Sequence, residues 1–237
     1  MSWIECQVAS VEDETPIDRS LVLEVPAAHA GEFLFRPGQH VRVRVPARTE
    51  GPREGFYSLS SAPSEVPSLT ITVRARGEVG SALYTVPAGA GLRITPPSGS
   101  FVLEEARPLL LLAAGSGIAP YRSFLRHLAG RERGEPVTLV HSVRTREHLL
   151  FRGEVEALAR RHPWLGYDPA VTTEGGGAAS TGRGRSLEAA VLDAVAKAPA
   201  PLLVYACGPA PFVTAALAAA RTAGVPAGDL RREVWGA

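Results

Sequence analysis

The sequence is poor in cysteine, with Cys6 and Cys207 as the two in a chain of 237 residues. Two thiols cannot by themselves ligate a cysteine-rich metal or iron–sulfur cluster. A disulfide framework is not expected from so few cysteines, so we predict reduced thiols and a cytoplasmic protein. The histidines show no spacing typical of metal ligands, and we predict no metal site.

An excess of charge of either sign is also missing. Lys and Arg number 25 against 24 Asp and Glu, which leaves a net charge of +1. This balance argues against a generic nucleic-acid surface. No apolar run reaches transmembrane length, and the N-terminus has no signal-peptide pattern. At 45% hydrophobic composition, the chain can build one large domain or two ordinary ones.

The N-terminal part of the chain has the pattern of an all-β domain. Segments that alternate apolar and polar residues are separated by turns rich in Gly and Pro, and they lie at 19–25, 39–46, 56–61 and 68–76. A further strand pair is expected over 91–103. Short strands at such regular spacing predict a small antiparallel barrel or a sandwich.

The pattern changes near residue 105, where buried strands begin to alternate with helices. We predict strands at 108–114, 136–142, 166–172 and 200–207. The intervening helices are expected at about 119–132, 148–162, 185–197 and 209–223. Such alternation predicts a parallel α/β sheet. The low-complexity segment 172–186 is expected to be a mobile surface loop.

The stretch RPLLLLAAGSGIAPYRSFLRHL (107–128) sits at the start of this second part. The four leucines predict a buried strand, and Gly115 and Gly117 predict a tight turn. The apolar residues after this turn recur at the spacing of a helix. A helix N-terminus after such a turn offers unpaired N–H groups to an anion. The pattern alone leaves open an ordinary strand–helix turn or a nucleotide loop. Ligand sites in such sheets lie beyond the carboxyl ends of the strands, where this turn falls.

Seven segments are spread along nearly the whole chain. They are FRPGQHVRV (35–43), FYSLSS (56–61), GEVGSALY (77–84), PPSGSF (96–101), AAGSGIAPYRS (113–123), CGP (207–209) and REVWGA (232–237). In this order they resemble the ferredoxin–NADP reductase superfamily. The resemblance implies two domains: a six-stranded antiparallel β-barrel for flavin at 1–104, and a doubly wound parallel α/β domain for the nicotinamide nucleotide at 105–237. It implies FAD and NADPH as cofactors, with NADH possible.

The resemblance also implies roles for individual residues. Tyr57 would pack on one face of the flavin ring and Trp235 on the other, while Ser58, Cys207 and Glu233 would join Trp235 as catalytic residues. The flavin-binding set would be Tyr57, Ser58, Leu59, Ser60, Val73, Arg74, Val79, Gly80, Ser81, Ala82 and Trp235. Purely structural roles stay open as alternatives: Tyr57 as a core aromatic, Trp235 as an anchor of the tail, and Glu233 as a solvated charge.

Two positions depart from the family pattern. Gly55 stands where the family has an arginine that neutralises a flavin phosphate, and Arg53, Arg74 and the N–H groups of Gly80–Ala82 could share that task. Thr173 replaces an arginine of the nucleotide site. The implied nucleotide-binding set is Gly115, Ser116, Gly117, Pro120, Arg144, Thr173, Arg183, Cys207, Gly208 and Pro209. Arg144 and Arg183 favour NADP over NAD.

The leading hypothesis is a flavoenzyme that takes hydride from NADPH and passes single electrons to a separate ferredoxin or flavodoxin. Such carriers are acidic, and Arg36, Arg42 and Arg44 would form a basic docking rim on a monomer. One alternative is an NADH-dependent reductase component of an oxygenase system. Another is a non-catalytic domain that kept the fold and lost flavin, for which Gly55 is the support.

Overall fold

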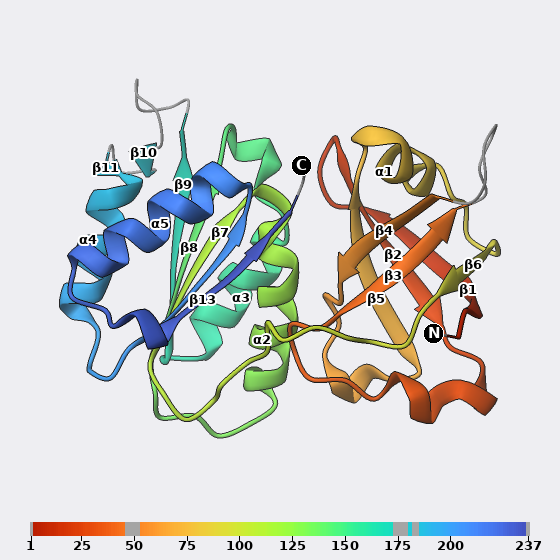
Figure 1. The fold of residues 1–237 in the computed structure, drawn as a ribbon, viewed down its shortest axis with the longest axis horizontal. Helices are drawn as coiled ribbons and strands as arrows, with labels where there is room; N and C mark the ends of the chain where they lie inside the picture. Colours follow the sequence, from red (N-terminus) through yellow and green to blue (C-terminus); the bar gives the residue numbers. More distant parts are fainter. Residues whose placement is uncertain (1, 46–52, 173–179, 182–184, 236–237) are drawn as a thin grey trace. The chain divides into compact units, whose positions relative to one another are not determined.

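The computed structural model describes residues 2–45, 53–172, 180–181 and 185–235. Contacts within the chain divide it into two compact units. The first unit comprises Met1–Leu103 and Ala119–His127, and the second comprises Glu104–Ile118 and Leu128–Ala237. Both belong to the classes expected from the sequence (Figure 1).

The first unit is built on an antiparallel six-stranded sheet curled like a barrel. Its strand order is β4-β3-β6-β1-β2-β5. An isolated bridge between Leu59 and Ile71 links the chain just after β4 to β5, the strand at the opposite edge. The strands are β1 (Ile4–Asp13), β2 (Asp18–Glu24), β3 (His40–Val45), β4 (Arg53–Ser58), β5 (Ser68–Arg74) and β6 (Gly91–Ile94). The six-stranded antiparallel prediction is confirmed.

The strand pair expected over 91–103 is wrong. Only β6 forms there. Beyond Ile94 the chain bonds to β3 without forming a strand, through an isolated bridge between His40 and Ser98 and through the Thr95 N–H, which donates to the Arg42 carbonyl oxygen. Pro96 and Pro97 explain the difference, because proline has no N–H to donate to a strand ladder. The residue pattern that predicted a strand pair over 91–103 therefore extends beyond the residues that can pair with the sheet.

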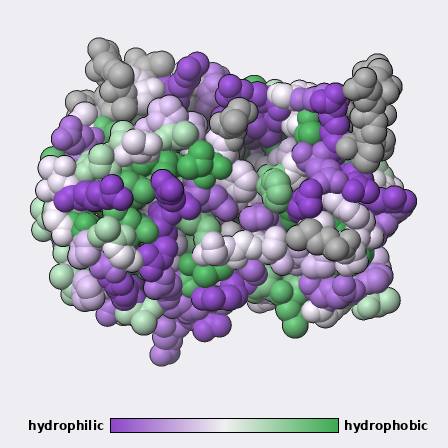
Figure 2. Space-filling view, viewed as in Figure 1, coloured by the Kyte–Doolittle hydropathy of each residue, from purple (hydrophilic) through white to green (hydrophobic). Residues whose placement is uncertain are grey.

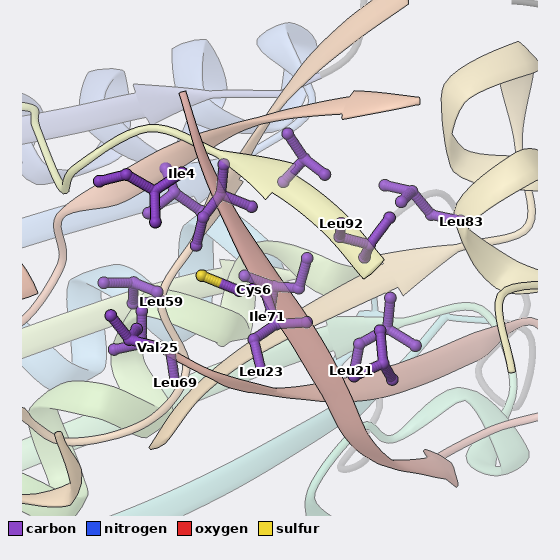
Figure 3. Packing of buried hydrophobic residues seen from close by; sticks show 14 of the residues in the cluster. Ile4, Cys6, Leu21, Leu23, Val25, Leu59, Leu69, Ile71, Leu83 and Leu92 are labelled. Carbon is purple, nitrogen blue, oxygen red and sulfur yellow. The ribbon is translucent and has the colours of Figure 1, made fainter. Parts of the chain in front are cut away.

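Alternation of apolar and polar residues builds the barrel core. In β3, Val41, Val43 and Val45 are buried while the arginines between them remain partly exposed. Figure 3 shows the Cys6 sulfur among the aliphatic side chains of this cluster. Burial raises the pKa of the Cys6 thiol to about 12. Cys6 therefore acts as a small hydrophobic residue at neutral pH.

Short helices complete the first unit. The helix α1 (Gly77–Tyr84) follows β5 and packs against it. Two 3₁₀ turns, η1 (Ala27–Phe33) and η2 (Pro63–Glu65), occupy the connections after β2 and β4. The GEVGSALY segment (77–84) thus forms a helix, which lies directly beside the strand that carries Arg74.

The second unit carries a parallel five-stranded sheet of order β13-β12-β7-β8-β9. Its strands are β7 (Leu109–Ala114), β8 (Val137–Val143), β9 (Leu165–Val171), β12 (Leu203–Gly208) and β13 (Leu230–Val234). Every pairing is parallel. Its helices are α3 (Arg152–Arg161), α4 (Leu187–Lys197) and α5 (Ala210–Thr222). The helix α2 (Ala119–Ala129) follows β7 in the chain, but its residues up to His127 belong to the first unit. The parallel α/β prediction is confirmed.

The path of the chain through this sheet sets where ligands can bind. From the central strand β7 the chain adds β8 and β9 on one side, then returns to add β12 and β13 on the other. Helices α4 and α5 lie against the sheet (Figure 1), and their buried residues join those of the strands in one cluster. The carboxyl ends of β7 and β12 therefore flank the point where the strand order reverses.

Several boundaries differ from the expected ones. The helix expected from 148 begins at Arg152, after the 3₁₀ turn η4 (Arg146–His148) and Phe151, whose φ is 56°. The low-complexity segment contains the short antiparallel strands β10 (Ser180–Thr181) and β11 (Arg185–Ser186). Thr173 and Arg183 lie outside the described residues.

Two properties of the described part of the chain bear on function. No helix in it is long and apolar enough to cross a membrane. Within the same residues, no cluster of three or more His, Cys, Asp or Glu side chains is arranged to hold a metal ion. Figure 2 shows hydrophilic residues over much of the visible face, with apolar residues scattered among them.

Candidate functional site

Two turns meet at the carboxyl ends of β7 and β12, in what we call the switch-point site (residues 113–118 and 207–209). The strands are directly paired there, with Cys207 opposite Ala113. After β7 the chain forms the 3₁₀ turn η3 (Gly115–Ile118) and enters α2 at once. Six of the predicted nucleotide-binding residues come together here: Gly115, Ser116, Gly117, Cys207, Gly208 and Pro209.

Glycine is required at this site because the two backbones touch. A Cβ on Gly117 would lie 2.3 Å from the carbonyl oxygen of Cys207. Gly208 has φ +151°, and a Cβ there would lie 2.9 Å from the Cβ of Ala114. Any side chain at either position would push the turns apart. The close approach leaves main-chain groups rather than side chains facing a ligand.

The start of α2 offers hydrogen-bond donors beside this backbone. Gly115 turns the chain with φ +54°, and its carbonyl oxygen lies 3.0 Å from Nε2 of the buried His141. No side chain caps the helix, which continues directly from η3, and the N-terminal end of this helical segment carries the positive end of the helix dipole. Pro120 fills a position where an N–H would be unbonded anyway. The site therefore suits an anion such as a nucleotide diphosphate.

Arg144 stands one strand away from the meeting turns. It follows β8, the neighbour of β7, and its side chain is exposed. The carboxyl ends of parallel strands share one edge of a sheet, so Arg144 lies on the same edge as Gly115. The second predicted basic residue, Arg183, lies outside the described residues, as does Thr173.

Trp235 docks onto the switch-point site. It follows β13, its backbone N–H donates to the carbonyl oxygen of Gly208 at 3.1 Å, and its indole Nε1–H donates to the Cys207 Sγ at 3.0 Å. Glu233 lies opposite Cys207 in the β12–β13 pairing. The tail aromatic is thus anchored to its own unit, next to residues expected to contact nicotinamide.

Cys207 is unsuited to act as a nucleophile. Its side chain is fully buried, and burial together with the nearby Glu233 carboxylate raises the pKa of the thiol well above its usual value. A nucleophilic cysteine requires the thiolate, which this environment disfavours. Cys207 is therefore a small buried residue that lines the site, and its sulfur accepts a hydrogen bond from Trp235.

A second constellation, the barrel site (Gly55, Tyr57, Val79 and the first turn of α1), lies in the first unit. Gly55 and Tyr57 are paired with Val43 and Val41, so they share the core-facing side of β4. A Cβ on Gly55 would lie 2.9 Å from Tyr57 Cε2 and 3.1 Å from Val79 Cγ1. The Tyr57 ring therefore leans over Gly55 and against α1. Burial raises the pKa of its phenol to about 12, which keeps it neutral.

Glycines fix how α1 joins this site. Gly77 begins the helix with φ +66°, and a Cβ on Gly80 would lie 2.4 Å from the carbonyl oxygen of Arg74. No side chain caps the helix. The N–H groups without an intrahelical partner are those of Gly77–Val79, because Ser81 and Ala82 lie deep enough to bond within the helix. The expected donor group, Gly80–Ala82, is thus displaced by one turn.

The two arginines near the barrel site differ in how firmly they are held. Arg74 donates two hydrogen bonds to the Asp18 carboxylate, from Nε to Oδ1 at 2.7 Å and from Nη2 to Oδ2 at 2.9 Å. Asp18 is fully buried and also accepts from the Thr15 hydroxyl at 2.7 Å. Arg53 pairs with Glu78 at 2.7 Å, and both side chains are about half exposed. Arg74 is therefore a structural residue, while Arg53 is loosely held.

Some predicted flavin-binding residues face inward. Leu59 and Val73 belong to the barrel core, so only their backbones can reach a ligand. The buried Ser60 hydroxyl lies 3.2 Å from both the Thr70 carbonyl oxygen and the Thr72 hydroxyl. Ser58 is buried at the end of β4, while Ser81 is exposed on α1.

The residues present fit a flavin nucleotide. Tyr57 offers a half-buried aromatic ring, and the uncapped first turn of α1 beside it offers N–H groups to a phosphate.

Sequence reasoning missed Asp18 and His141, which hold Arg74 and the Gly115 turn. Neither carries a local signal, since each acts on a residue distant in the chain.

Comparison with known proteins gives consistent relatives. Residues 111–217 match the family model of the oxidoreductase NAD-binding domain. The chain is 32% identical to ferredoxin–NADP reductase B of Sorangium cellulosum, over 76% of this chain and 73% of that protein. It is 34% identical to the ferredoxin reductase component of 3-ketosteroid-9-alpha-monooxygenase of Mycolicibacterium smegmatis, over 98% of this chain.

The chain spans 65% of the length of that Mycolicibacterium protein. Among solved structures, the flavohem-like FAD/NAD-binding domain of nitric oxide dioxygenase from Vibrio cholerae superposes with a TM-score of 0.83, at 23% identity and with full coverage of both chains. At that identity, the superposition supports the fold alone.

Proposed function

The chain belongs to the ferredoxin–NADP reductase family, and from that premise we propose a flavin-dependent NAD(P)H oxidoreductase. It takes hydride from NADPH onto FAD and passes single electrons to a separate ferredoxin- or flavodoxin-type carrier. The observation that carries the proposal is the backbone contact of Gly117 with Cys207, beside the uncapped start of α2. This arrangement suits a dinucleotide at the switch point of the sheet.

In this proposal each site has a separate task. FAD, when bound, supplies the conversion of a two-electron donor into single electrons. Tyr57 would pack against its ring, and the Ser58 hydroxyl would be a polar group of the barrel site. The Glu233 carboxylate, opposite Cys207, would be a polar group of the nucleotide site. The N–H groups at the start of α2 hold the diphosphate of the nicotinamide nucleotide, and Arg144 faces its 2′-phosphate.

The tail controls access to the nicotinamide position. Trp235 rests on Cys207 through the indole–sulfur hydrogen bond. We assign this position to the nicotinamide ring, so Trp235 leaves Cys207 when the nucleotide binds productively. Orientation of the ring by the Cys207 wall is the contribution of the chain, because hydride transfer depends on alignment.

The carrier docks on the outer face of β3 and β4 in this proposal. Arg42 and Arg44 both pair with Glu54, and Arg44 lies 4.0 Å above the Trp3 ring. Two guanidiniums sharing one carboxylate leave one positive charge, beside the exposed ring of Phe56. Arginine and aromatic residues are typical of interface centres.

Charge reversal tests this docking surface. The variant R42E/R44E is expected to raise the KM for a [2Fe–2S] ferredoxin and to flatten the salt dependence of its reduction. Reduction of ferricyanide, which needs no docking, should stay unchanged. Equal ferredoxin kinetics in the variant and the wild type would contradict the surface.

The remaining assignments complete the proposal. We divide the chain at 104/105 into a flavin domain and a nucleotide domain, and we propose a monomer in the cytoplasm that does not bind nucleic acid. Support comes from the small net charge of +1 and from the two cysteines, both buried as free thiols.

A second candidate is an NADH-dependent reductase component of an oxygenase system. The name of the Mycolicibacterium relative, a component of a monooxygenase, favours it. The two candidates differ in the preferred nucleotide, so kcat/KM for NADPH and for NADH separates them. A preference for NADPH supports the first candidate, while equal values or a preference for NADH support the second.

The visible absorption spectrum of the purified protein tests the enzyme class itself. A flavin band that NADPH bleaches in the absence of air is the expected result. A colourless protein that FAD cannot reconstitute would contradict the proposal. It would support instead a non-catalytic domain that has lost flavin.

A further inference from the structure

Because Gly55 stands where the family pattern has an arginine, the barrel site lacks a positive charge at this position. The structure explains why an arginine does not stand there. The Tyr57 ring and Val79 fill the space into which a side chain at position 55 would project, at 2.9 and 3.1 Å from its Cβ. Position 55 is thus taken up by the packing of Tyr57 against α1. Any cation for a bound phosphate has to come from elsewhere on the barrel.

Arg74 is poorly placed to supply that charge. Both its bonds go to Asp18, which is completely buried and has the Thr15 hydroxyl as a further partner. Withdrawing Arg74 would leave a buried carboxylate without its counter-ion, which is strongly unfavourable. Arg74 therefore stays on Asp18 whether or not a ligand is bound.

Arg53 has the opposite character. It precedes Gly55 by two residues on β4, so it points to the same side of the strand as Gly55 and Tyr57. Its partner Glu78 lies in the first turn of α1, among the N–H groups that lack intrahelical partners. The pair is about half exposed on both sides, and such surface pairs are weak. Arg53 is thus near the barrel site and free to change partner.

We propose that Arg53 supplies the positive charge for a phosphate of the bound flavin nucleotide, and that Glu78 competes with this phosphate for Arg53. The inference rests on the proposed flavin binding. A phosphate at the first turn of α1 would lie beside the Glu78 carboxylate, so it displaces Glu78 from Arg53 and is repelled by it. In the free protein Glu78 is the counter-ion of Arg53, and a bound phosphate must break this ion pair.

Two substitutions should then have opposite effects on affinity. R53Q removes the cation and is expected to weaken FAD binding about tenfold, as the loss of a charge-assisted contact does. E78Q removes the competing carboxylate and is expected to tighten FAD binding severalfold. Riboflavin has no phosphate, so its affinity should be the same in wild type and both variants.

The measurement is the dissociation constant of flavin-depleted protein for FAD and for riboflavin, from the quenching of flavin fluorescence. R93Q is the matched control, because Arg93 is an exposed barrel arginine paired at 3.6 Å with the exposed Glu5. Its FAD affinity should equal that of the wild type. Thermal unfolding of each variant without flavin checks that the barrel is intact.

The outcomes separate this inference from the proposed function. If the wild type binds neither FAD nor riboflavin, flavin binding itself fails and the inference falls with it. If the wild type binds FAD and R53Q binds it as tightly as R93Q does, only the role of Arg53 is overturned. If R53Q loses FAD and riboflavin affinity equally, Arg53 shapes the barrel and does not bind phosphate.

Discussion

Single atoms decide whether the switch-point site can form. The carbonyl oxygen of Cys207 lies where a side chain of Gly117 would begin, and the sulfur of the same residue receives the Trp235 indole. One strand end thus sets the position of both the η3 turn and the tail. Changes of one methyl group should therefore be visible in stability and in nucleotide binding.

Gly117→Ala is expected to lower the free energy of unfolding by about 1–3 kcal/mol, because its Cβ would stand 2.3 Å from a carbonyl oxygen. It should also weaken NADP⁺ binding, since the turns must separate. Urea denaturation and a binding titration measure both effects. Gly134→Ala is the control, because nothing lies within 4 Å of a Cβ there. Equal stability of the two variants would contradict the close contact.

Cys6 should make stability depend on alkaline pH. Burial raises the pKa of its thiol from 9.0 to about 12 in the folded protein, so the unfolded chain loses this proton first. The contribution is present below pH 9 and is lost as pH rises toward 12. Cys6→Ala should therefore show a shallower fall of unfolding free energy between pH 8.5 and 10. Parallel curves for variant and wild type would count against it.

Residue roles differed in how far the sequence revealed them. Tyr57 and the glycines at 115 and 117 belong to contiguous motifs, so the sequence indicated where they would lie. The bonds of Asp18 to Arg74 and of His141 to Gly115 join residues distant in the chain. No local spacing encodes such pairs, because folding alone brings them together.

At the scale of elements, patterns failed where two physical requirements conflicted. β13 went unpredicted because three of its five residues, Arg231, Arg232 and Glu233, are charged, as suits a strand at a sheet edge. The second strand expected in 91–103 did not form because two prolines follow Thr95. Long runs such as Leu109–Leu112, where burial and strand formation agree, were identified correctly.

An ion pair closes one end of the antiparallel ladder between β2 and β5. Asp18 opens β2 and Arg74 closes β5, directly opposite each other in the register. Asp18→Asn is expected to destabilise the protein by about 2 kcal/mol, below the range for fully buried pairs because Arg74 is partly exposed. Chemical denaturation measures the loss.

A surface pair provides the comparison for Asp18. Asp13 pairs with Arg19 at 2.6 Å, but its side chain is 61% exposed. Asp13→Asn should change stability much less than Asp18→Asn, because solvent screens the pair. Similar losses from the two substitutions would mean that burial of Asp18 does not decide its contribution.

For the whole molecule, the two compact units should respond to different ligands. A ligand that binds the folded state raises the unfolding temperature according to its concentration relative to its Kd. FAD is expected to stabilise the first unit through the barrel site, and NADP⁺ the second through the switch-point site. Differential scanning calorimetry with each ligand alone and both together tests this.

The calorimetric effects have a clear control. Gly117→Ala should reduce the shift caused by NADP⁺ and leave the shift caused by FAD intact. An identical reduction of both shifts would mean that the variant disturbs the whole chain. Loss of the FAD shift alone would contradict the assignment of the dinucleotide site to β7 and β12.

The contact between Trp235 and Cys207 gives this protein a built-in optical reporter. Thiols quench indole emission, and here the two groups are 3.0 Å apart. The chain has three tryptophans, so replacing Trp3 and Trp164 by phenylalanine would leave Trp235 as the sole emitter. Its brightness, followed in a stopped-flow instrument after mixing with nucleotide, would time the departure of the tail in solution, without reference to turnover.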